Sequence, residues 1–134
     1  MTELSTRHIF RRVYQTATGR RDDDVWNEAW EHIREHLSES AGKEKARHSV
    51  FLKRYRSRDR VAELIAQAAN APSGSEASYL TVGGQPTGAP CLNFWRWFNE
   101  PIGEDGEETL WVVAGQDGKL VTAYPKDRHG DNRN

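Results

Sequence analysis

Two hydroxyl-bearing residues near the end of the chain, Thr122 and Tyr124, stand two positions apart in a run that is typical of a β-strand. Because side chains alternate along a strand, both hydroxyls are expected on one face of a sheet, with Val121 and Ala123 on the other. Pro125 ends the run, because it has no N–H to give to a ladder. Such a pair can donate hydrogen bonds to a ligand or a reacting group, and it is also compatible with a partly exposed strand.

Histidines supply candidate acids and bases, and two of them, His32 and His36, are one helical turn apart. In a helix they would lie toward the margin of an apolar stripe centred on Trp26, where both can face a groove beside a sheet. The same pair matches the H-x-x-E-H pattern of some zinc hydrolases, which requires a third ligand elsewhere. Two solvated surface histidines are the remaining interpretation of this spacing.

A strongly basic segment precedes the third predicted helix. Residues 43–60 contain eight Lys or Arg against two acidic residues, whereas the whole chain has a net charge of −1. Such a strip suits RNA phosphates, although a solvated connector can have the same composition. His48 is a candidate acid or base within it, and both His48 and Tyr55 can stack on bases.

Histidines, cations and hydroxyls, taken without a metal, suit the cleavage of RNA through its own 2′-hydroxyl. One histidine removes the 2′ proton while another protonates the 5′-leaving oxygen. A cation and hydroxyl donors stabilise the charge that develops on the phosphorane. An activated Ser or Cys is not needed, because the nucleophile belongs to the RNA.

The first half of the sequence predicts the helices that must position these groups. A weak apolar pattern spans about residues 4–15, and a strong one, which begins among acidic residues, spans 22–38. Ser57 can cap a third helix that runs to about Ala71, where Pro72 prevents its continuation.

The second half predicts a sheet, after a join rich in helix breakers at residues 71–75. The last two β-rich runs flank a loop that ends in Asp117-Gly118, which is typical of a hairpin. The strands are expected at residues 77–82, 92–98, 110–114 and 119–124, and the second of them is apolar on both faces, as in a central strand. We therefore expect an α+β fold, with N-terminal helices packed on one face of a twisted antiparallel sheet of about four strands.

The length of 134 residues suits one domain with a modest core, which we expect over residues 1–125. Residues 1–25 are either part of that domain or a preceding helical segment, and the polar residues 126–134 are predicted to be a disordered tail. The single cysteine, Cys91, excludes an internal disulfide framework and the Cys-rich zinc motifs. The sequence contains neither an apolar run of ~18 residues nor the apolar core of a signal peptide.

Three segments of the chain, taken together and in their order, are similar to segments of a known protein family. They are Trp30-x-His32-Ile33-x-x-His36, then Arg47-His48-Ser49-Val50-Phe51, and finally Gly118-Lys119-x-x-Thr122-Ala123-Tyr124-Pro125. In this order they resemble the small ribonuclease toxins of the barnase/EndoU/colicin/RelE-like group, over roughly residues 26–125. These toxins are C-terminal domains of contact-dependent inhibition and other polymorphic toxin systems.

The resemblance implies a function as well as a fold. It implies metal-independent cleavage of tRNA or another RNA to a 2′,3′-cyclic phosphate, without a cofactor. It further implies a cognate immunity protein that blocks the site, and delivery from a producing bacterium into the cytoplasm of a target cell.

The resemblance also assigns site residues. Thr122 and Tyr124 would be a T-x-Y pair, and His32 or His36 would act with His48 as acid and base. Substrate binding would use cations and a hydroxyl around the basic segment, namely Lys45, Arg47, Ser49 and Lys53.

Two other functions remain open from the residues themselves. A non-catalytic immunity partner or nucleic-acid-binding module would use the tryptophan-rich surface and the basic strip. A zinc hydrolase would use His32 and His36 as ligands.

Overall fold

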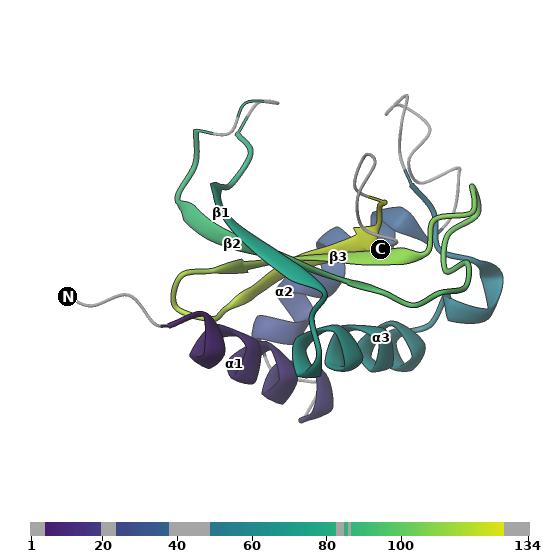
Figure 1. Cartoon of the computed structure of the whole chain (residues 1–134), viewed down its shortest axis with the longest axis horizontal. Coiled ribbons are helices and arrows are strands. Elements are labelled where there is room, and N and C mark those ends of the chain that lie inside the picture. The colour runs from purple at the N-terminus through teal and green to yellow at the C-terminus, as the bar shows by residue number, and fades with distance from the viewer. Residues whose placement is uncertain (1–4, 20–23, 38–48, 83–84, 86, 128–134) are drawn as a thin grey trace.

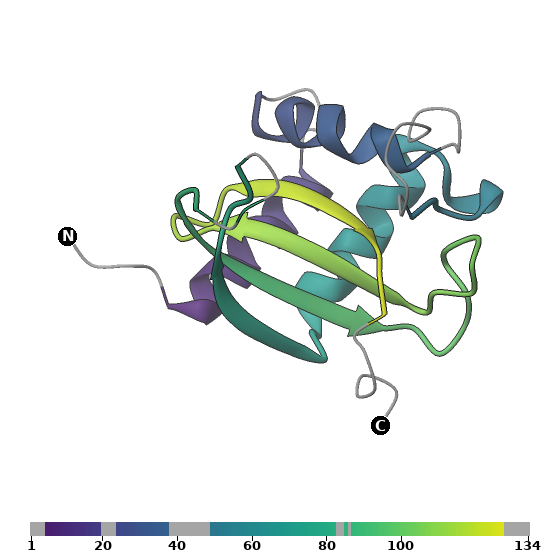
Figure 2. The ribbon, with the colours of Figure 1, turned by 90° about the horizontal axis from the view of Figure 1, so that it is seen from above.

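A computed structural model describes residues 5–19, 24–37, 49–82, 85 and 87–127 of the chain. Three α-helices precede a four-stranded antiparallel sheet whose strands lie in sequence order, so the expected α+β fold is confirmed. Figures 1 and 2 show the helices on one side of the sheet. The elements are α1 (Thr6–Thr18), α2 (Asp24–Ile33), α3 (Arg58–Asn70), β1 (Gly74–Tyr79), β2 (Pro90–Trp97), β3 (Thr109–Gly115) and β4 (Leu120–Pro125), with 3₁₀ helices η1 (Arg34–His36) and η2 (Lys53–Tyr55).

The helix boundaries follow local capping chemistry. The Ser5 and Ser57 side chains accept hydrogen bonds from the backbone N–H groups of His8 and Arg60, which caps α1 and α3. The predicted cap at Ser57 is therefore confirmed. The helix expected over 22–38 is an α-helix only to Ile33, and a tighter 3₁₀ turn continues it through His36.

The first strand begins earlier than the sequence predicts. It starts at Gly74 rather than Ala77, within the segment interpreted as breakers, and ends at Tyr79 rather than Val82. Gly74 pairs with Trp95, and a Cβ at Gly74 would stand 2.6 Å from an indole carbon of that residue. Glycine is therefore required at this position by close packing, not by a turn.

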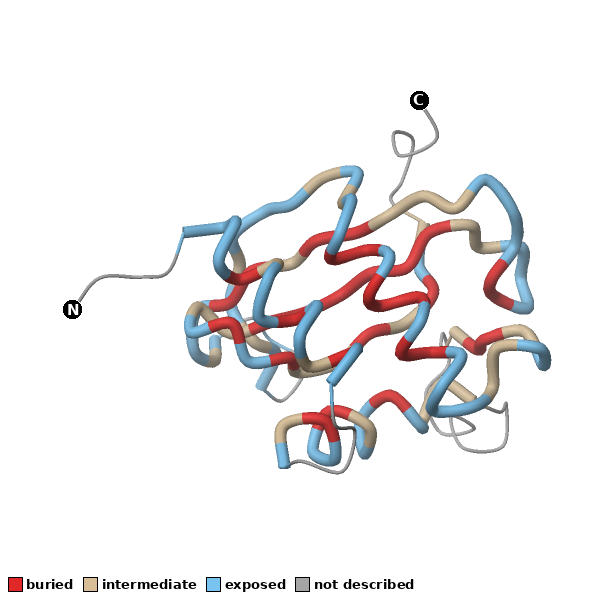
Figure 3. Tube along the Cα trace, turned by 90° about the horizontal axis from the view of Figure 1, so that it is seen from below, coloured by how far each residue is buried: buried red, intermediate tan, exposed pale blue. Residues whose placement is uncertain are grey.

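One face of the sheet and the three helices enclose the main core. Trp26 of α2, Phe51 and Phe94 of β2 are fully buried in it. Figure 3 shows that buried segments follow the strands and recur along the helices. The opposite sheet face carries a smaller buried cluster, composed of Cys91, Trp95, Trp111 and Val113.

The hairpin predicted around Asp117-Gly118 is present, and it contains an irregularity that the sequence did not reveal. Thr122 pairs with Val113, but the next pair joins Leu120 to Ala114, so Val121 is an extra residue in β4. Thr122 and Tyr124 share one face of the sheet, as predicted, and this is the helix-free face. The expectation that Val121 points the other way is wrong, because the bulge lets it pack against the cluster on that same face.

The edge strand β4 is covered by a helix. Helix α2 packs against it, and Figure 2 shows this helix running beside the β4 edge of the sheet. The chain segment that ends α2 therefore lies next to the last strand. Within the described residues, no helix is both long and apolar enough to cross a membrane.

Candidate functional site

A pocket of about 480 Å³ lies where the end of β4 meets the turn after α2. It gathers groups from four separate segments of the chain. Its lining residues are His36, Ser49, Glu107, Tyr124, Pro125, Lys126 and Asp127. We call it the His36 pocket. Four titratable side chains and a lysine cation thus share one concave site, which is typical of an active site.

His36 and Tyr124 are in direct contact in this pocket. Their rings stack with centroids 5.1 Å apart and planes 19° apart. His36 ends η1, and Tyr124 is the fifth residue of β4, so the packing of α2 against β4 brings them together. Both were predicted as site residues, and the structure places them side by side.

The backbone of residues 49–51 orients the His36 ring. The Nδ1 atom lies 2.7 Å from the Ser49 carbonyl oxygen and 3.3 Å from the Ser49 hydroxyl. Because a carbonyl only accepts, Nδ1 must carry the proton, and Nε2 bears the lone pair in the neutral ring. The Phe51 N–H donates in return to the His36 carbonyl at 2.8 Å, which fixes the two segments to each other.

Ser49 was expected to bind phosphate with its hydroxyl, and that role stays a prediction. In the structure its carbonyl is the closer partner of the histidine. The neighbouring residues hold this carbonyl in place, because Glu104 donates its N–H to the Val50 carbonyl, and Leu52 donates to that of Ile102.

Tyr124 is partly buried, and this burial raises the pKa of its phenol above the ordinary value of 10.0, with a smaller contribution from the nearby Cys91. Its hydroxyl is thus held in the protonated form at neutral pH, as a hydrogen-bond donor. Thr122 lies two residues earlier on the same face, opposite Val113, but it is not among the residues that line the His36 pocket.

Glu107 is one of the site residues that the sequence did not single out. Burial raises the pKa of its carboxyl above 4.5, although the backbone N–H groups of Glu107 and Asp105 oppose this. Its Oε1 accepts the Asp105 N–H at 3.1 Å. The only sequence signal is the Asp105-Gly106 turn, which reverses the chain so that the next residue returns toward β3.

Lys126 and Asp127 belong to the segment predicted as a tail, yet the structure places both beside the sheet. Lys126 donates its N–H to the Thr109 carbonyl at 3.0 Å, and its ammonium lies 4.7 Å from the centre of the Trp111 ring. An Asp127 oxygen accepts the Glu108 N–H at 3.0 Å. Residues 128–134 lie outside the described residues.

His32 is not part of the His36 pocket. It is exposed on α2 and lines a second pocket, one helical turn away. The two histidines of the zinc pattern therefore contribute to different cavities. Among the described residues, no group of three or more His, Cys, Asp or Glu side chains is arranged to hold a metal ion.

The remaining predicted residues lie around the basic segment. His48, Lys45 and Arg47 fall outside the described residues, so their predicted roles are untested. Lys53 is exposed on η2 and does not line the His36 pocket.

The described part of the basic strip is largely engaged with the protein itself. Arg56 pairs with Glu104 and donates to the Phe51 carbonyl, and Arg58 donates to Asn27 and lies over the ring of Trp30. Arg54 donates to a backbone carbonyl and lies over the Tyr55 ring, whose hydroxyl donates to Glu100. These contacts hold the three arginines against the protein surface, and a phosphate-binding role for the strip stays a prediction.

No protein-family model, curated protein or solved structure matches this chain. The chemistry of the site has to be inferred from its own side chains.

Proposed function

We propose that this chain is a metal-independent endoribonuclease, which cleaves tRNA or another RNA to a 2′,3′-cyclic phosphate. The observation that carries the proposal is the stacking of His36 on Tyr124 in a pocket that also contains Glu107 and Lys126. A proton acceptor, a proton donor, a hydroxyl donor and a cation are the groups that this reaction requires.

The reaction forms a bond between the 2′-oxygen of the RNA and phosphorus while the bond from phosphorus to the 5′-oxygen breaks. Glu107 accepts the proton of the 2′-hydroxyl, and its raised pKa brings its basicity closer to that of an effective base near neutral pH. His36, in its doubly protonated imidazolium form, donates the Nε2 proton to the departing 5′-oxygen and is left as the neutral ring with its proton on Nδ1. The products are a 2′,3′-cyclic phosphate and a free 5′-hydroxyl, so atoms and protons balance.

The other groups bind the phosphate as its charge develops. The protonated Tyr124 hydroxyl donates a hydrogen bond to a phosphoryl oxygen, and the Lys126 ammonium supplies a positive charge at the same pocket. The Ser49 carbonyl, by holding Nδ1–H of His36, presents Nε2 as the nitrogen that exchanges its proton with the substrate. Thr122 contributes a hydroxyl to the same sheet face, where it contacts the RNA beside the cleaved bond.

We further infer a biological role from the sequence resemblance. The enzyme acts as a toxin of a contact-dependent inhibition or other polymorphic toxin system, delivered from a producing bacterium into the cytoplasm of a target cell. A cognate immunity protein neutralises it by covering the His36 pocket.

The test is incubation of the purified protein with total tRNA in the presence of a chelator. Wild type should give discrete fragments with cyclic-phosphate ends, and His36→Ala or Glu107→Gln should cut on the order of a hundredfold more slowly. Tyr124→Phe should lose a comparable factor. His8→Ala, which removes an exposed histidine of α1, is the matched control and should retain full activity.

Two outcomes would contradict the proposal. A folded His36→Ala protein that cleaves at the wild-type rate would remove His36 from the chemistry. RNA that is bound in a salt-dependent manner but never cut would instead select a non-catalytic nucleic-acid-binding role.

A further inference from the structure

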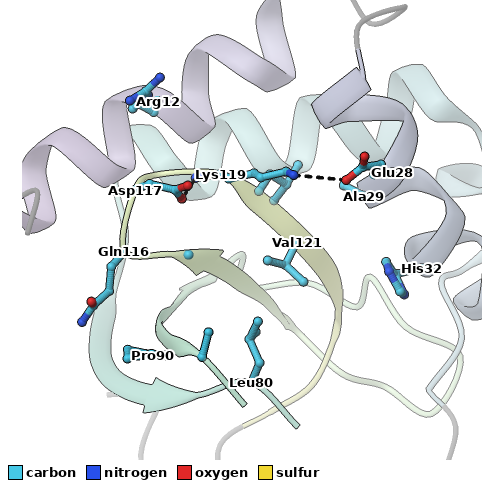
Figure 4. A pocket seen from close by; sticks show the side chains of 13 residues that line it. Arg12, Glu28, Ala29, His32, Leu80, Pro90, Gln116, Asp117, Lys119 and Val121 are labelled. Atoms are coloured by element: carbon cyan, nitrogen blue, oxygen red, sulfur yellow. Dashed lines mark hydrogen bonds and ion pairs between the residues drawn. The ribbon is translucent and has the colours of Figure 1, made fainter. Parts of the chain in front are cut away.

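A second and larger pocket lies near the start of β4. Its volume is about 690 Å³, and we call it the Val121 pocket. In Figure 4, Val121 of β4, Leu80 after β1 and His32 of α2 project toward the same space. Ala29 and Pro90 add further apolar surface. The result is a cavity with largely apolar walls contributed by a helix and by two hairpins.

Charged groups lie around these apolar walls. The Lys119 ammonium pairs with the Glu28 carboxylate at 3.2 Å, as Figure 4 shows, and this ion pair joins the start of β4 to α2. Arg12 of α1 also lines the pocket. Apolar walls with a few charged groups at the rim are typical of a small-molecule site.

The same two elements connect this pocket to the His36 pocket. Strand β4 contributes Val121 to one and Tyr124 to the other, about 10 Å apart along a strand. The segment α2–η1 contributes His32 to one and His36 to the other, separated by about 7–8 Å along the α-helix and the 3₁₀ turn. The bulge is what places Val121 on the same sheet face as Tyr124.

We propose that the Val121 pocket binds the nucleobase next to the cleaved bond, and so selects where the RNA is cut. This inference rests on the proposed ribonuclease function. Leu80, Pro90 and Val121 offer apolar surface to the faces of the base, while Arg12, Lys119 and His32 offer donors to its ribose and phosphate. A purine should bind more tightly than a pyrimidine, because it buries more apolar surface in the same walls.

Two matched variants distinguish a change inside the Val121 pocket from a similar change just outside it. Ala89 is exposed and lines the pocket, so Ala89→Phe should fill part of it without disturbing the core. The Leu80 N–H donates to the Ala89 backbone carbonyl at 2.9 Å, and the substitution leaves that carbonyl unchanged. Thr87, in the same loop, is exposed and does not line the pocket, which makes Thr87→Phe the control.

Binding can be measured without any cleavage, by titrating the protein with adenosine or uridine 5′-monophosphate and following amide shifts by NMR. These probes contain no phosphodiester bond to cut. Adenosine monophosphate should shift Leu80, Val121 and His32, and bind about tenfold more weakly to Ala89→Phe. Thr87→Phe should change the Kd by less than about twofold. Shifts confined to the His36 pocket, or an Ala89→Phe protein with unchanged affinity, would overturn the proposal.

Cleavage distinguishes failure of this proposal from failure of the ribonuclease function. If the wild type cuts RNA and Ala89→Phe cuts the same sites with the same preference, the pocket does not select the base, while the function stands. If the nucleotide binds at the Val121 pocket and no RNA is cut, the function fails and the pocket remains a nucleotide site.

Discussion

Gly74 lies directly beneath the indole of Trp95, so closely that a Cβ at this glycine would stand 2.6 Å from Cζ2 and 2.9 Å from Cε2. The indole cannot move away easily, because its ring is stacked on that of Trp111 with centroids 4.8 Å apart. The start of β1 is therefore defined by two tryptophans on the helix-free face of the sheet.

Gly74→Ala should destabilise the protein by about 1–3 kcal/mol, since a methyl group would be forced into a rigid aromatic stack. Urea unfolding followed by tryptophan fluorescence measures the change. Ser75→Ala, one residue later at an exposed position, is the control and should fall within about 0.5 kcal/mol of wild type. Equal stability of both variants would show that the indole is not confined over Gly74.

The carboxyl of Glu107 should make stability depend on pH. Because burial raises its folded-state pKa above 4.5, the folded protein holds this proton more tightly than the unfolded chain does. The corresponding stability is present below the ordinary pKa and is lost as the pH rises through the folded-state pKa. Glu107→Gln has no such proton to lose. Its free energy of unfolding should therefore increase relative to that of the wild type as the pH rises from acid to neutral.

Unfolding by urea over a series of pH values measures that difference. Glu31→Gln, which removes an exposed carboxylate paired with Arg34, should not show the trend. A Glu107→Gln protein whose stability parallels that of wild type at every pH would exclude a raised pKa at Glu107.

His36 should carry its proton on Nδ1 in the neutral form, because its nearest partner is a carbonyl oxygen at 2.7 Å. Nitrogen-15 spectra of the histidine rings distinguish this tautomer from the commoner Nε2–H form. Ser49→Ala should preserve it, since the substitution removes the hydroxyl at 3.3 Å but keeps the carbonyl. An Nε2–H ring at His36 in the wild type would contradict the proposed orientation of the catalytic nitrogen.

The cap of α3 gives a simple stability prediction. Ser57→Ala should cost about 1 kcal/mol, because the Arg60 N–H loses its acceptor at the helix start. Ser57→Gly should cost only a few tenths of a kcal/mol, as is usual at this position. Thermal unfolding of the two variants in parallel would test whether the hydroxyl or the backbone geometry of Ser57 matters.

Much of the fold follows from local patterns in the sequence. The apolar stripe around Trp26, the cap at Ser57 and the Asp117-Gly118 turn each act over a few residues, and each appears where it was predicted. The start of β1 was missed because Gly74 is required by Trp95, a residue twenty-one positions later. The bulge at Val121 was missed for a similar reason, since it depends on the register between two strands.

The site was only partly predictable. Tyr124 and His36 could be chosen as candidates from their residue types alone, because an imidazole and a phenol can exchange or donate protons. The packing of α2 on β4 brings them together. Ser49 acts through a carbonyl that every residue possesses, so its type gives no signal. Glu107 is one of several acidic residues in its loop, and its place in the lining of the His36 pocket distinguishes it from them.

Both pockets depend on the last strand in the described chain. Tyr124 and Val121 come from β4, while His36 and His32 come from the segment at residues 24–36. A folding intermediate in which the helices have formed and β4 is still detached would contain every histidine of this segment and neither pocket. Assembly of the site therefore requires contacts between residues far apart in the sequence, and catalytic competence would report completion of the sheet more directly than helix content does.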